Sequence, residues 1–192
     1  LGSHEGELCA LARATIFEDP TGVRFLYDAG HTLTGGDDPR LGTIHMVLLS
    51  HAHGDHIGDR KLKAPGAGTC AAYESVPAGP NSMTAEVTAA KNAAIVMTND
   101  MGIFVGQKIQ KITGGKPITF CPQTAGATNV PVAMPCRSNT HLGASFIAKA
   151  AGASQGVEIT IVYASHANNV PLTLLSDARR ASHEPDGTSL VL

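Results

Sequence analysis

Three histidines and an aspartate occupy four of six consecutive positions in this 192-residue chain, as His51, His53, Asp55 and His56. Imidazole and carboxylate groups are the ligands of borderline divalent ions, above all zinc (Zn2+), with iron and manganese as alternatives. The whole chain has 9 histidines, so this clustering favours a metal site over a histidine-rich surface loop. On an extended backbone His51 and His53 project to one face. A tight turn at Gly54 would then direct Asp55 and His56 toward a second centre.

The segments around the cluster predict how it is held. Residues 44–49 form a near-continuous apolar run with the length of a strand buried on both faces. Residues 23–28 predict a second strand, which stops at a glycine turn, and the alternating stretch 157–163 predicts a third. This third strand ends close to His166. We therefore expect the cluster on a loop that leaves a central strand, joined there by a histidine from another strand end.

Helical patterns alternate with these strands. Ser82 is placed to cap a helix over 83–92, a strand is predicted over 94–98, and a further helix is predicted to end at Thr113. Residues 64–82 are rich in glycine, proline and small side chains, and they are predicted to be irregular. The alternation of helices and strands predicts the α/β class. Without a repeat or a linker, residues 1–192 are expected to form one domain.

Composition and charge limit the classes of partner that we expect for this chain. Hydrophobic residues make up 43% and charged residues 16%, with a formal net charge of −2, which is typical of a soluble globular protein. The only dense basic stretch, 60–63, is assigned to a solvated face, so we expect no nucleic-acid partner. We also expect no membrane association, because no apolar run approaches the length of a membrane-spanning helix.

The four cysteines are expected to be buried thiols, with a disulfide between Cys121 and Cys136 as the alternative. The compartment, cytoplasmic or periplasmic, and the oligomeric state stay open.

The segment Leu48-Leu49-Ser50-His51-Ala52-His53-Gly54-Asp55-His56 resembles the H-x-H-x-D-H signature of the metallo-β-lactamase superfamily. The strand end Asp28-Ala29-Gly30 is also similar to that of the family's second strand. This resemblance implies an αββα sandwich and two metal ions, with His51 and His53 on the first ion and Asp55 and His56 on the second. It also implies a third histidine on the first ion. His166 is the best match, and His141 is the rival.

Two further parts of the family pattern are not evident after His166. Asp177 and His183 only faintly imitate the family's bridging aspartate and last histidine. We therefore expect the sandwich to be incomplete at both ends of this chain and the second ion to be held weakly. Asp28 is expected to support the motif from behind, and His45 to be packed inside its strand.

The resemblance implies a metal-dependent hydrolase that acts on a small-molecule substrate through a metal-activated water. Asp55 is the expected catalytic residue, which both binds metal and orients the water. A small ester, lactone or amide is the expected substrate, because Ser165-His166-Ala167 is closer to lactonase-like and uncharacterised branches than to true β-lactamases. The alternatives are a phosphodiesterase or nuclease of the same fold and a non-catalytic metal-binding protein.

Overall fold

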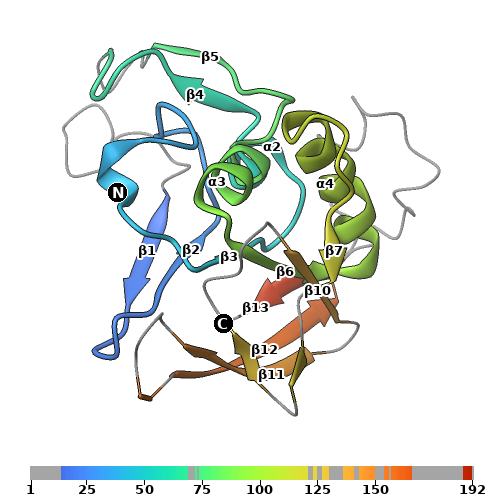
Figure 1. Cartoon of the computed structure of the whole chain (residues 1–192). Helices are drawn as coiled ribbons and strands as arrows, with labels where there is room; N and C mark the ends of the chain where they lie inside the picture. Colours follow the sequence, from blue (N-terminus) through green and yellow to red (C-terminus); the bar gives the residue numbers. More distant parts are fainter. Residues whose placement is uncertain are drawn as a thin grey trace.

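The computed structural model describes residues 14–68, 72, 74–120, 123–124, 127–129, 136–140, 143–149, 154–155, 157–165 and 188–191. The helices and strands carry the labels of Figure 1, and their bounds are β1 Thr15–Glu18, β2 Arg24–Tyr27, η1 Pro39–Leu41, β3 Met46–Leu48, α2 Gly54–Ile57, β4 Arg60–Leu62, β5 Ser75–Pro77, α3 Met83–Lys91, β6 Ala94–Thr98, α4 Asn99–Ile112, β7 Thr119–Phe120, β8 Gln123–Thr124, β9 Ala127–Asn129, β10 Cys136–Thr140, β11 Gly143–Lys149, β12 Val157–Ser165 and β13 Thr188–Val191.

Within this described part, the strands form two sheets and a small hairpin of β4 with β5. The larger sheet has the order β1-β2-β3-β6-β10-β7, with only β1 antiparallel to its neighbour. The second sheet has the order β13-β12-β11-β9-β8. Figure 1 shows α3 and α4 on one side of the larger sheet and the second sheet on the other. The predicted α/β class is confirmed.

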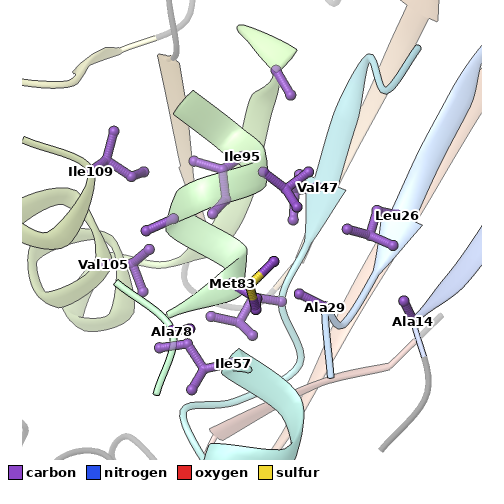
Figure 2. Close-up of a cluster of buried hydrophobic side chains, with 14 of the residues drawn as sticks. Ala14, Leu26, Ala29, Val47, Ile57, Ala78, Met83, Ile95, Val105 and Ile109 are labelled. Atoms are coloured by element: carbon purple, nitrogen blue, oxygen red, sulfur yellow. The ribbon is translucent and has the colours of Figure 1, made fainter. Parts of the chain in front are cut away.

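The central strands of the larger sheet are buried on both faces, as their apolar sequences predicted. Leu26 on β2 pairs with Val47 on β3, which pairs with Ile95 on β6, so these three side chains form one row. All three belong to the hydrophobic cluster under the helices, shown in Figure 2. Met46 and Leu48 point the opposite way along β3, and both are fully buried.

Capping residues define the ends of α3, and buried apolar side chains at helical spacing define the inner face of α4. The Ser82 hydroxyl accepts a hydrogen bond of 3.0 Å from the Ala85 amide, and α3 ends at Asn92 in the left-handed region, with φ of 50°. Helix α4 places buried side chains at helical spacing, at Met101, Phe104, Val105 and Ile109. The two helices predicted from the sequence are therefore confirmed.

The local structure differs from the expectation at two places. Residues 64–82 are not wholly irregular, because Ser75–Pro77 forms strand β5 against β4. Gly54 begins a one-turn helix, α2, rather than a simple turn. The predicted strand over 157–163 is β12, which extends to Ser165 and lies in the second sheet. None of the helices in the described part of the chain has the length and apolar character of a membrane span.

Candidate metal centre

The site begins where two parallel strands end at the same edge of the larger sheet. Tyr27, the last residue of β2, pairs with Leu48, the last residue of β3. The Asp28 amide continues this pairing by donating a hydrogen bond of 3.0 Å to the Leu48 carbonyl oxygen. Asp28 therefore lies beside Ser50, two residues after β3, and the histidine motif follows at once.

Asp28 turns its carboxylate across this edge. Its backbone has φ of 48°, in the left-handed region that few non-glycine residues adopt. The Ser50 amide donates a hydrogen bond of 2.8 Å to Oδ1 of Asp28, and the Ser50 hydroxyl lies 2.7 Å from Oδ2. Nδ1 of His56 lies 2.6 Å from the same Oδ2. A buried carboxylate thus holds both the loop and one ring of the motif.

His51 and His53 form the first pair of potential metal ligands. Nε2 of His51 lies 3.1 Å from Nδ1 of His53. Two nitrogens that bind one tetrahedral zinc ion at about 2.0–2.1 Å lie roughly 3.3–3.4 Å apart. The two nitrogens form a hydrogen bond, and their spacing is a few tenths of an ångström shorter than that of neighbouring ligands on a single ion. On its other side, Nδ1 of His51 lies 2.9 Å from the Ser50 hydroxyl.

Asp55 and His56 form the second pair. Oδ2 of Asp55 lies 3.6 Å from Nε2 of His56, again close to the spacing of two ligands on one ion. Both residues lie on α2, and Ile57 on the same turn is fully buried in the core. Gly58 ends this helix with φ of 74°. Its carbonyl oxygen accepts a hydrogen bond from the Met83 amide, which ties α2 to the start of α3.

His31 supports the same turn from the loop after β2. Its Nε2 atom lies 2.9 Å from the Gly54 carbonyl oxygen and 2.6 Å from Oδ1 of Asp59. The Asp59 carboxylate packs against Gly54 so closely that a Cβ atom there would lie 2.8 Å from its Cγ atom. Nearby, the Gly30 amide donates to the His56 carbonyl oxygen at 3.3 Å. The loop after β2 therefore contacts α2 through both backbone and side chains.

The surroundings shift the protonation of two motif histidines in opposite directions. Burial, followed by the neighbouring rings of His56 and His53, lowers the pKa of His51 to about 4. The hydrogen bond to Asp28 raises the pKa of His56. Burial and the Asp28 charge also raise the pKa of Tyr27. His51 is therefore neutral near neutral pH, which is the form that binds a metal ion.

The donor chemistry fits zinc, but the described side chains supply only part of a coordination shell. Within the described residues, no three histidine, cysteine, aspartate or glutamate side chains converge as a complete ligand set. A catalytic zinc ion takes three protein ligands and one open position. Each pair therefore needs ligands from elsewhere. His166 and its rival His141 both lie outside the described residues, as do Asp177 and His183.

A cleft of about 670 Å3 lies between α3, the end of α4 and the loop at Gly36. Its described lining includes Lys61 and Glu86, which form an ion pair at 3.2 Å, but no residue of the histidine motif. The described lining of this cleft therefore does not include either candidate ligand pair.

Ser50 and Asp59 were not assigned a role from the sequence. Ser50 directly precedes the first motif histidine, and Asp59 follows the last by three residues. In the sequence, the position of these polar residues on either side of the histidine motif is therefore the signal that could have indicated their roles. Asp28, in contrast, was expected to support the motif and lies in contact with it.

Comparison of the chain with known family models, with curated proteins and with solved structures gives no significant match. Its function therefore has to be argued from the site.

Proposed function

We propose that this chain is a metal-dependent hydrolase of the metallo-β-lactamase type, with an αββα sandwich as its fold. His51 and His53 hold one ion, Asp55 and His56 hold a second, and His166 completes the first. Zinc is the preferred metal, with iron and manganese as alternatives. The observation that carries this proposal is the 3.1 Å spacing of Nε2 of His51 and Nδ1 of His53.

The groups behind the ligands add support. Metal-binding histidines commonly present their second ring nitrogen to a carboxylate or another polar partner, which fixes the orientation of the ring. Nδ1 of His56 faces Asp28, and Nδ1 of His51 faces the Ser50 hydroxyl. A histidine-rich surface loop without a function has no need for such buried partners.

A bound zinc ion supplies a Lewis acid that lowers the pKa of a water molecule and polarises the scissile carbonyl group. The side chain of Asp55 is 54% exposed, so it is accessible to that water and can orient it. The formal net charge of −2 favours a small ester, lactone or amide over a polyanionic nucleic acid.

Metal content tests the site directly. Wild type, His51→Ala and His166→Ala are incubated with zinc, freed of unbound ion and measured by elemental analysis. We expect about one to two ions in the wild type and less metal in both variants. His45→Asn, which changes a buried histidine outside the two pairs, is the control and should retain its metal. A wild type that stays metal-free after addition of zinc would overturn the proposal.

A substrate panel then tests the reaction. The zinc-loaded protein is assayed on a p-nitrophenyl ester, a lactone and bis-p-nitrophenyl phosphate. We expect hydrolysis of the ester or lactone and its loss in Asp55→Asn. Hydrolysis of the phosphodiester alone would assign the chain to the phosphodiesterase alternative. Full metal content without turnover of any substrate would identify a metal-binding protein that is not an enzyme.

A further inference from the structure

One buried hydroxyl lies between the two ligand pairs. The Ser50 oxygen lies 2.7 Å from Oδ2 of Asp28, 2.9 Å from Nδ1 of His51 and 3.2 Å from Nδ1 of His56. Ser50 is 3% exposed, so these protein groups, rather than bulk water, determine its hydrogen bonding. It therefore contacts one ring from each pair.

The number of protons available to Ser50 constrains its bonding. A serine hydroxyl donates one hydrogen bond and accepts at most two, whereas an ionised carboxylate only accepts. The single hydroxyl proton of Ser50 must therefore lie on the Asp28 bond, which is also the shortest and is charge-assisted. The remaining contacts of the Ser50 oxygen can only be accepted ones. His51 must then be a donor to Ser50.

The same count of donors and acceptors gives the proton positions on the rings of His51 and His56. His51 donates to Ser50 through Nδ1, so its Nε2 atom carries the lone pair and faces His53. His56 donates through Nδ1 to Oδ2 of Asp28 at 2.6 Å, so in the neutral ring its Nε2 atom carries the lone pair on the side of Asp55. Only the form protonated at Nδ1 satisfies these contacts for each neutral ring.

We infer that Ser50 is a positioning residue that, together with Asp28, keeps the ring proton of His51 and of His56 on Nδ1. Nε2 of each ring is thereby prepared as a metal donor, one in each pair. The consequence for metal binding rests on the proposed function, but the proton positions themselves require no metal. Because one oxygen contacts both rings, Ser50 also links the two pairs mechanically.

Proton positions can be observed in metal-free protein. With 15N-labelled histidine and a chelator, long-range 1H–15N correlation spectra, recorded at a pH where both rings are neutral, distinguish protonated from unprotonated ring nitrogens. We expect the form protonated at Nδ1 for His51 and His56 in the wild type. In Ser50→Ala, His51 loses the acceptor of its Nδ1 proton and shifts toward the form protonated at Nε2. His56 keeps Asp28 as its acceptor and should not shift.

Two further variants separate this role from general packing. Ser50→Thr retains the hydroxyl and should restore the spectrum of His51. Thr88→Val removes another buried hydroxyl, which donates to the Thr84 carbonyl oxygen within α3, and should leave both rings unchanged. We also expect Ser50→Ala to weaken zinc binding by roughly 10–100-fold, and Ser50→Thr to recover most of this loss.

The outcomes separate the two proposals. A wild-type His51 protonated at Nε2, or a His51 spectrum unchanged in Ser50→Ala, would overturn the role of Ser50. The wild-type spectrum alone decides the proton positions even if Ser50→Ala does not fold. A wild type with the expected proton positions and no affinity for any divalent metal would instead overturn the proposed hydrolase and leave the hydrogen-bond network intact.

Discussion

Nε2 of His31 lies 2.9 Å from the carbonyl oxygen of Gly54, so the loop after β2 holds the first residue of the helix that carries Asp55 and His56. The same nitrogen lies 2.6 Å from Oδ1 of Asp59. A ring nitrogen that faces two oxygen acceptors must carry a proton, and His31 therefore acts here as a donor.

We predict that His31→Ala loosens α2. The loss of this donor should speed the hydrogen exchange of the Ile57 and Gly58 amides, which bond to the carbonyl oxygens of His53 and Gly54. His31→Gln retains a donor and should show a smaller effect. Exchange rates measured by NMR in the presence of a chelator check this without any assumption about metal. Equal protection of these amides in wild type and His31→Ala would contradict the prediction.

Gly58 is predicted to be intolerant of a side chain. It has φ of 74°, and a Cβ atom there would lie 2.5 Å from both the Gly30 carbonyl oxygen and Cβ of Met83. The left-handed backbone and the overpacking together should cost roughly 2–5 kcal/mol of unfolding free energy in Gly58→Ala. Gly114 is a matched control, because it has φ of 70° with nothing within 4 Å of such a Cβ. Gly114→Ala should therefore cost only about 1–2 kcal/mol, and equal losses in urea unfolding would refute the predicted clash.

Asp38 and Arg40 form an ion pair that organises the loop before η1. The Asp38 side chain is fully buried and accepts hydrogen bonds from Arg40, from the Thr34 amide and from the Thr34 hydroxyl. Asp38→Asn removes the negative charge at nearly constant volume. Arg40, whose side chain is 25% exposed, then has no carboxylate partner at this position. We expect a loss of roughly 3–5 kcal/mol in urea unfolding. Asp37→Asn, at an exposed position one residue earlier, should change stability by less than about 0.5 kcal/mol.

His45 is predicted to make the protein less stable in acid. Burial lowers its pKa in the folded state below the ordinary value of 6.5. Above pH 6.5 the ring is neutral in both states, whereas at lower pH the unfolded chain takes up the proton first and folding stability falls. Arg24, the charged residue beside it, donates its amide to Nδ1 of His45 at 3.0 Å.

The measurement is the unfolding free energy in urea as a function of pH, with a chelator present. His45→Asn retains an acceptor for the Arg24 amide but does not titrate in this range. We expect its stability, whatever its absolute value, to fall less steeply than that of wild type as the pH drops below 6.5. Parallel pH profiles would show that the burial of His45 does not contribute to acid sensitivity.

Local signals explain what could be predicted from the sequence. The Ser82 cap and the apolar runs at Met46–Leu48 and Ala94–Thr98 act over a few residues, so they are readable without the fold. Asp28 was expected behind the motif because the resemblance to the metallo-β-lactamase superfamily implies a supporting carboxylate at that strand end. The α/β class follows from the same alternating pattern.

The roles of Ser50 and His31 could not be read in this way. They depend on the register that pairs Tyr27 with Leu48 and on the left-handed backbone of Asp28. Hydrophobic patterning does not encode the register between strands that are distant in sequence. The strand β5 was missed because its three residues, in a segment rich in glycine and proline, carry too short a pattern.

The parallel pairing of β2 with β3 also affects the order in which the protein can assemble. The contacts described among the two candidate ligand pairs and their polar partners lie between residues 27 and 59, whereas the second sheet begins only with β8 at Gln123. Ribosomes release the chain from its N-terminus, and closing a loop of about twenty to thirty residues costs little more entropy than closing a shorter one. The candidate ligand pairs on β2, β3 and α2, with the polar groups that hold them, can therefore form during synthesis, before the second sheet exists. The hydrogen-bond network around Ser50 would then be in place when the later strands arrive.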